Sequence, residues 1–145
     1  MMDKYDALKL DNQVCFPLYA VSKGIVALYQ PYLEEIDLTY TQYIAMMVMW
    51  EVKETNVKDL GSRLYLDSGT LTPLLKKLES KKLIKRSRDK KDERNLIISL
   101  TKEGEELKNK AVEIPFKIAN CLHLSEEEAT NLYKTLRKLM VNFYE

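Results

Sequence analysis

The sequence has no long hydrophobic run. Its longest uninterrupted stretch of apolar or aromatic side chains extends from Tyr43 to Trp50, eight residues, whereas a helix needs about 20 to span a bilayer. The segment from Met1 to Asp6 carries alternating charges and lacks the apolar core and small-residue cleavage site of a secretory signal. We therefore expect a cytoplasmic protein with no membrane-spanning helix.

Cysteine and histidine are scarce. The 145 residues include two cysteines, Cys15 and Cys121, and one histidine, His123. This set is too small for a four-ligand zinc site within one chain, and a reducing cytoplasm disfavours a permanent disulfide. The sequence also has no glycine-rich phosphate loop, nucleophile elbow or metal-ligand set. We expect free thiols, no metal, no cofactor and no enzymatic activity, with His123 on the surface or in a loop.

Glycine and proline are also few. The sequence has 4 of each, while 46% of its residues are hydrophobic and 31% are charged. This balance is typical of a soluble, helix-rich chain and excludes a disordered tail. Because the length suits one domain, we predict a single, mainly α domain over residues 1–145.

Hydrophobic periodicity and capping residues place the elements. Apolar side chains recur every three or four residues from Val14 to Tyr32, and Pro17 is tolerable only in a first turn, so a helix should begin close to Cys15. The pattern predicts helices at about 13–33, 40–52, 57–64, 68–81 and 101–120, the last kinked at Pro115, and a final helix after Ser125. The expected caps are Thr39 in a capping box with Gln42, Asn56, Asp67, Thr101, and Ser125 in a capping box with Glu128. Period-two alternation on both sides of a charged turn predicts a β-hairpin from Ile84 to Leu100.

Positive charge is concentrated in one segment. From Lys76 to Arg94 there are ten Lys or Arg and four acids, a local charge of +6, so the remainder carries 1 − 6 = −5. Such a run is commonly only a solvated surface. Here it coincides with a capped helix pair and an adjoining hairpin, the arrangement of a winged helix-turn-helix, in which the second helix enters the major groove and the hairpin, or wing, reaches the minor groove.

These features predict residues that bind double-stranded operator DNA. In the second helix they are Ser68, Thr70, Thr72, Lys76 and Lys77, and in the wing they are Arg88, Lys90, Lys91 and Arg94.

A second candidate site is centred on Cys15. At a helix start, free backbone N–H groups favour the thiolate, the reactive form of cysteine, and tyrosine hydroxyls can donate to it. Tyr19 follows one turn later, whereas Tyr29 lies about 21 Å along the same helix and cannot touch Cys15 within one chain. Tyr29 could reach it only across a two-fold dimer, and Tyr40 lies further along the chain. The alternative is that Cys15 is a small buried hydrophobe and the tyrosines are packing residues.

Four segments together resemble the MarR family of winged-helix regulators, and within it the organic-hydroperoxide sensors known as OhrR-like proteins. They are Leu10–Phe16, Leu38–Tyr43, Leu66–Lys76 and Lys91–Arg94. The resemblance covers essentially the whole chain. It implies a homodimer held by residues of about 1–35 and 101–145, with a DNA-binding region at about 53–100.

In that family the dimer represses a peroxide-detoxification gene until an organic hydroperoxide oxidises the cysteine. The resemblance implies that Tyr29 and Tyr40 of the partner contact Cys15, with Tyr19 nearby, and that Asp92 pairs with Arg94 in the wing. Some members use a second cysteine near the position of Cys121, so a disulfide between Cys15 and the Cys121 of the partner is a hypothesis.

Three alternatives stay open at this point. Similar regulators control broader stress or virulence programmes, and others respond to phenolic ligands, although such a sensor would not need Cys15. A thiol peroxidase is the alternative from another class. It is disfavoured because no Thr or Arg motif around Cys15 is arranged to bind a peroxide.

Overall fold

The computed structural model describes residues 3–145, so Met1 and Met2 of the predicted dimerisation segment lie outside the described residues. Its elements are two short 3₁₀ turns (Asp6–Leu8, Leu10–Asn12), α1 (Cys15–Glu34), α2 (Tyr40–Val52), β1 (Glu54–Asn56), α3 (Val57–Leu64), α4 (Ser68–Ser80), β2 (Ile84–Arg88), β3 (Leu96–Leu100), α5 (Lys102–Ala111), α6 (Ile114–Leu122) and α7 (Glu126–Tyr144). The mainly α class with a small hairpin is confirmed. Within residues 3–145, no helix is both long and apolar enough for a bilayer.

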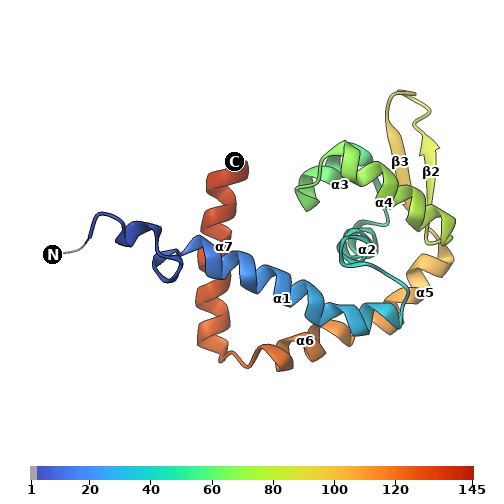
Figure 1. Ribbon diagram of the computed structural model, residues 1–145. Helices are drawn as coiled ribbons and strands as arrows, with labels where there is room; N and C mark the ends of the chain where they lie inside the picture. The colour runs from blue at the N-terminus through green and yellow to red at the C-terminus, as the bar shows by residue number, and fades with distance from the viewer. Residues whose placement is uncertain (1–2) are drawn as a thin grey trace.

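Helix α2 forms the centre of the core. Thr39 and Gln42 make the predicted capping box at its start, and Ala45, Met46 and Met49 are fully buried. In Figure 1 the helix is seen end-on, with α3 and α4 on one side and α1 and α5 on the other, and it contacts all four. Trp50 fixes the contact with α5 because its indole Nε1 donates to Gly104 O at 2.8 Å within the core.

Helices α3 and α4 are joined by a tight turn. Asn56 and Asp67 cap them as predicted, each accepting from a backbone N–H three residues on. Helix α3 ends at Tyr65, which has a left-handed φ of 54°, and a Cβ on Gly61 would lie only 2.9 Å from Leu66 O. A small residue is therefore required where the turn passes back over α3.

The predicted hairpin is part of a larger sheet. Its strands, β2 and β3, pair antiparallel with Arg86 opposite Ile98, and β1 pairs with the other side of β3. The strand order is β1-β3-β2, so β2 is an edge strand. The sequence did not predict β1. This strand has three residues between two helices in the chain, which are too few to show an alternating pattern.

The single helix predicted for residues 101–120 is wrong. The structure has two helices there, α5 and α6, separated at Val112 and Glu113. Pro115 explains the break, since it has no N–H to donate to the carbonyl of Ala111 and its ring would clash with that carbonyl. It is instead placed in the first turn of α6, where the missing donor costs nothing.

The outer helices are poorly covered by the rest of the chain. Pro17 lies in the first turn of α1, as predicted, and Leu33 is the buried residue of this helix. Helix α7 has no buried residue although an apolar stripe follows its length. Large apolar side chains on both helices are therefore exposed, among them Leu18, Val21, Leu132, Tyr133 and Phe143, and so is Val14 just before α1. Such contiguous apolar exposure is typical of a protein interface.

Candidate DNA interface and thiol site

Helix α4 separates its apolar and polar side chains between two faces. Its leucines, Leu71, Leu74, Leu75 and Leu78, are buried against the core. The predicted DNA-binding residues Ser68, Thr70, Thr72, Lys76 and Lys77 are all exposed. Asp67 Oδ1 accepts from the backbone N–H of Thr70 at 2.8 Å, which keeps the first turn of α4 regular. The polar face is therefore available for a ligand along most of the helix.

The loop from Asp89 to Asn95 forms the tip of the wing. Asp89 N donates to Asn95 O at 2.9 Å, and Arg88 donates to Glu93 O at 3.2 Å. Asp92 Oδ1 accepts from the backbone N–H of Arg94 at 3.1 Å and lies 3.5 Å from its Nε. An exposed ion pair of this kind adds at most about 1 kcal/mol to stability, so its main effect is to orient Arg94.

The predicted wing cations are presented to solvent. Arg88, Lys90, Lys91 and Arg94 are all exposed, and the side chain of Arg94 is 95% exposed. A long cation on a structured loop is well suited to enter a narrow, negatively charged groove.

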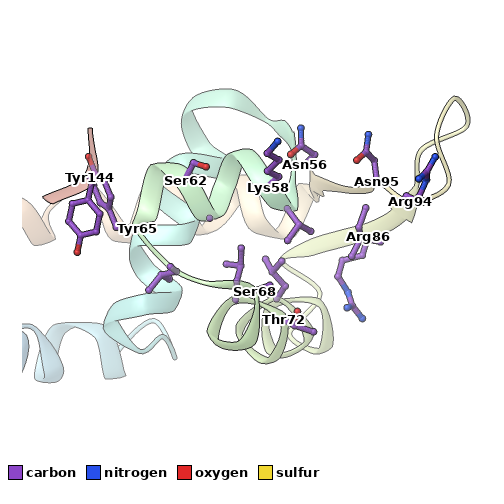
Figure 2. Close-up of a pocket in the computed structure, with 16 residues that line it drawn as sticks. Asn56, Lys58, Ser62, Tyr65, Ser68, Thr72, Arg86, Arg94, Asn95 and Tyr144 are labelled. Carbon is purple, nitrogen blue, oxygen red and sulfur yellow. The ribbon is translucent and has the colours of Figure 1, made fainter. Parts of the chain in front are cut away.

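A groove of about 720 Å³ connects α4 with the wing. Figure 2 shows Lys58 and Ser62 on α3 above Ser68 and Thr72 on α4, with Asn95 and Arg94 on the wing. The described residues that line it include Lys58, Arg86 and Arg94 but no carboxylate, so an anionic backbone is the ligand that it favours.

Lys58, Ser62 and Asn95 line the groove but were missed from the sequence, and Arg86 was counted in the basic segment without being named as a DNA-binding residue. Lys58 lies outside the basic segment, and nothing in the sequence alone marks the polar side chains of Ser62 and Asn95 as part of a groove. Asn56 also lines the groove, although the sequence identified it only as a cap. At the far end the rings of Tyr65 and Tyr144 stack with centroids 4.3 Å apart, which brings the end of α7 to the helix pair.

Cys15 is the first residue of α1 and is exposed. It therefore lies where the helix leaves backbone N–H groups without helical partners. The hydrogen bonds of residues 3–145 include none between Cys15 and a tyrosine, and the unbroken helix keeps it about 21 Å from Tyr29. Tyr19, one turn on, is also exposed, and Lys23 Nζ lies 5.1 Å from the centre of its ring.

Three tyrosines gather at the other end of α1. The ring centroids of Tyr29 and Tyr40 are 5.1 Å apart, and Tyr43 lies 5.7 Å from Tyr29. Burial raises the pKa of Tyr29 and raises that of Tyr43 to about 12. Both phenols therefore remain protonated at neutral pH and can donate to an acceptor.

Cys121 lies in α6, exposed, beside the C-terminal part of α1. Its Sγ is 3.9 Å from the hydroxyl of Tyr32, a residue that the sequence did not single out. This contact raises the pKa of Tyr32, which keeps its hydroxyl protonated. Lys117 Nζ lies 5.5 Å from the centre of the same ring. The described residues contain no cluster of three His, Cys, Asp or Glu side chains that could hold a metal ion.

Comparison with known proteins identifies the fold and family. Residues 27–111 match the family model described as transcriptional regulator SarA/Rot. The organic hydroperoxide resistance transcriptional regulator of Bacillus subtilis is 44% identical over 145 residues, covering 100% of this chain and 99% of that one. The regulator SarZ of Staphylococcus aureus is 49% identical over 131 residues, covering 90% and 88%.

A solved structure agrees over the same length. Reduced, DNA-bound AbfR superimposes with a TM-score of 0.80 at 33% identity, covering 99% of this chain and 100% of that one. AbfR, from Staphylococcus epidermidis, is also known in a disulfide form. These relatives confirm the resemblance inferred from the sequence, including its hydroperoxide-sensor branch. The chain belongs to the SarA/Rot family of transcriptional regulators and has their MarR-like winged-helix fold.

Proposed function

We propose that this regulator is a cytoplasmic, homodimeric repressor that leaves its operator when an organic hydroperoxide oxidises Cys15. The observation that carries the proposal is the exposed Cys15 thiol on the first residue of α1. The Bacillus relative is named for organic hydroperoxide resistance, and AbfR is known in a reduced form bound to DNA and in a disulfide form. A peroxide-detoxification gene is the expected target.

The DNA contact has two parts. Helix α4 enters the major groove with Ser68, Thr70 and Thr72 toward the bases, and Lys76 and Lys77 neutralise phosphates. The wing enters the adjoining minor groove with Arg94, supported by Asp92, and its other cations contact the backbone. The groove between them accepts a phosphate backbone beside Lys58. A second subunit repeats these contacts on the other half-site.

The outer helices build the dimer. Residues 1–35 and 101–145 contain α1, α6 and α7, and many large apolar side chains of these helices are exposed within the described chain. Two copies related by a two-fold axis bury these stripes against each other. In that arrangement α1 of one subunit runs antiparallel to α1 of the other, so Cys15 approaches Tyr29 and Tyr40 of its partner, with Tyr19 nearby.

The sensing step is a two-electron oxidation of sulfur. The Cys15 thiolate attacks the terminal oxygen of the hydroperoxide, an S–O bond forms, and the O–O bond breaks. Cysteine sulfenic acid and an alkoxide result, and the alkoxide takes a proton from water to leave as an alcohol. Protonated tyrosines stabilise the thiolate before the reaction, and the sulfenic acid no longer accepts from them in the same way.

Release of DNA follows from dimer geometry. A shift of α1 at Cys15 changes the angle between subunits and hence the distance between the two α4 helices. Two half-sites one helical turn apart tolerate little change in that distance. The affinity for operator therefore falls.

Cys121 supplies a second step. Its thiolate attacks the sulfenic sulfur of Cys15 in the partner, an S–S bond forms, and hydroxide leaves to become water on protonation. The disulfide must cross between subunits, because the two sulfurs lie at opposite ends of α1 and a disulfide needs Cα atoms within about 7 Å. AbfR, which has a disulfide form, is the precedent.

A gel-shift assay with cumene hydroperoxide tests the sensing step. We expect the wild type to leave a duplex from its own upstream region on oxidation and to rebind it after reduction. Cys15→Ser should remain bound throughout. Release by Cys15→Ser would exclude this cysteine as the sensor, and repeated consumption of hydroperoxide with a thiol reductant would indicate a peroxidase instead.

Non-reducing electrophoresis tests the second step. After hydroperoxide treatment the wild type should migrate as a covalent dimer, whereas Cys121→Ser should migrate as a monomer. Monomer bands for the wild type, together with full loss of DNA binding, would rule out the disulfide.

A further inference from the structure

One carboxylate connects the recognition helix to the wing. Glu79 lies in the last turn of α4, and its Oε2 accepts from the backbone N–H of Arg86 in β2 at 2.8 Å. Its Oε1 accepts from Nη2 of the same arginine at 3.0 Å. The carboxylate thus fixes both the main chain and the side chain of a single residue in the stalk of the wing.

The contact is better defined than an ordinary surface ion pair. The side chains of Arg86 and Glu79 are 22% and 36% exposed, and Arg86 Nε is buried with no partner in the described chain. The hydrogen bonds from Arg86 hold the pKa of Glu79 below its usual value, so the carboxylate is ionised at neutral pH. Because β2 is the edge strand, its Arg86 N–H has no further strand to pair with.

Beyond this contact, the loop at the tip of the wing is held by hydrogen bonds among its own residues. Arg88, Asp89 and Asp92 hold the tip through bonds within the loop, and Arg94 depends on Asp92 for its orientation. The angle between α4 and β2 therefore decides where Arg94 lies relative to α4.

A small change in that angle displaces the tip of the wing by a large distance. The four residue steps from Arg86 to Lys90 span about 13 Å when extended, so a rotation of about 10° at Arg86 moves the tip by about 2 Å. The minor groove is only about 6 Å wide. Such a displacement is enough to remove Arg94 from the groove while α4 stays in place.

We propose that Glu79 and Arg86 are positioning residues for DNA reading, which set the wing against α4 and so give the protein its preference for base pairs that flank each half-site. The proposal rests on the proposed function, in which α4 and the wing read adjacent grooves. It adds that flank preference depends on a contact made within the protein by Glu79, which does not line the groove.

The test uses the full-length protein and a synthetic duplex chosen by in vitro selection from a random pool. Its flanks are made A·T-rich or G·C-rich, and separately one base pair under α4 is exchanged. For the wild type we expect about tenfold tighter binding to A·T-rich flanks and a similar loss for the base exchange. Arg94→Ala, which removes the wing contact itself, should bring the flank ratio close to one.

Glu79→Ala should also bring the flank ratio close to one and leave the penalty for the base exchange unchanged. Adding Arg94→Ala to it should reduce the ratio no further. Glu79→Gln, which retains an oxygen acceptor for Arg86 N–H, should fall between Glu79→Ala and the wild type. The matched control is Glu51→Ala, which removes a 2.8 Å ion pair with Arg63 between α2 and α3 and should keep both ratios.

Two results would overturn the proposal. One is an unchanged flank ratio in Glu79→Ala. The other is an equal loss of flank and base discrimination, which would mean a general structural defect. A wild type that shows no flank preference would contradict wing reading itself, and one that binds no selected duplex would contradict the proposed function.

Discussion

At the scale of single residues, a few tightly packed backbone positions determine how the core that supports the DNA-binding surface can pack. Gly104 is the clearest case, because its carbonyl accepts from Trp50 and its Cα faces the chain at Leu83. A Cβ at this position would lie 2.2 Å from Leu83 O and 2.6 Å from Leu100 Cδ1. The start of α5, the end of α2 and the end of β3 therefore meet at a position that has no room for a side chain.

Gly104→Ala should strongly destabilise the fold. The backbone of Leu83 must move to admit the methyl group, and overpacking of this kind costs about 3 kcal/mol or more. Denaturant unfolding followed by circular dichroism measures the change. Gly24→Ala is the control, because an added Cβ there meets no atom within 4 Å and α1 should be stabilised. Equal stability of the two variants would contradict the packing described.

Arg94→Ala should weaken operator binding and also its dependence on salt. Loss of one groove cation costs about tenfold in affinity and lowers the slope of log K against log salt by about 1. Fluorescence anisotropy at several salt concentrations gives both quantities. Lys110→Ala, which removes an exposed cation from α5, should change neither. An unaltered slope in Arg94→Ala would show that the wing makes no ionic contact.

Tyr43 should titrate late in alkaline solution. Its pKa is raised to about 12 in the folded protein because burial disfavours the phenolate, and its ordinary value is 10.0. The folded state therefore holds this proton more tightly than the unfolded state, so Tyr43 stabilises the fold below about pH 10 and this contribution is lost as the pH rises toward 12. Tyrosinate absorbance measures the titration. Tyr43→Phe should remove the latest-ionising component, and its persistence would assign that component elsewhere.

At the scale of elements, caps were the most informative part of the sequence. Thr39, Asn56, Asp67, Thr101 and Ser125 were each identified from their spacing, and each accepts the expected backbone N–H. A cap is a local interaction over three residues, so its signal is complete in the sequence. The same applies to the hairpin, whose two strands are close in the chain.

Features that depend on tertiary contacts gave weak signals or none. Strand β1 exists because β3 offers it an edge, and the contact of Glu79 with Arg86 exists because α4 ends beside β2. The break before α6 had a local signal in Pro115, but a kink and a full break differ only in how the following helix packs. Of the candidate site, the exposure of α4 and the wing was predictable, whereas Lys58 joins the groove only through the fold.

Asp67→Ala should disturb the recognition helix at the turn that carries Ser68 and Thr70. Loss of the cap leaves a backbone N–H of this turn without its partner and costs about 1 kcal/mol. We expect lower stability in thermal unfolding and weaker operator binding in the same variant. Asp67→Asn retains a side-chain acceptor and should restore both. Failure of asparagine to restore stability would mean that charge, and not the cap, is what matters at this position.

At the scale of the whole molecule, one part of the chain has a buried apolar core, and the other part leaves its apolar side chains exposed to solvent. The buried residues are concentrated in α2, α4 and the sheet, while α7 has none and the first turns of α1 are open to solvent. A stripe of apolar side chains without cover is costly in water, at about 25 cal/mol for each Å². A second copy of the chain that covers this stripe contributes stability, and it also supplies the second DNA-binding region.

Leu132→Asp should therefore separate the proposed dimer. Leu132 lies on the apolar stripe of α7 and is 42% exposed in the chain alone. A carboxylate at this position loses its hydration on association, so sedimentation should show a monomer at concentrations where the wild type is dimeric. Operator affinity should fall with it, since one half-site is then bound alone. Thr130→Asp, on the opposite face of α7, should stay dimeric. A dimeric Leu132→Asp would place the interface elsewhere.

The position of Trp50 has a practical consequence. It is the one tryptophan of the sequence, and it is 8% exposed between α2 and α5, with its indole N–H bound to Gly104. Intrinsic emission therefore reports loss of the central packing as a single spectroscopic event. Because Trp50 lies in α2, outside α1 and the wing, its emission does not report oxidation of Cys15 or motion of the wing directly. Oxidant titrations that leave emission unchanged while DNA is released would separate signalling from denaturation in one cuvette.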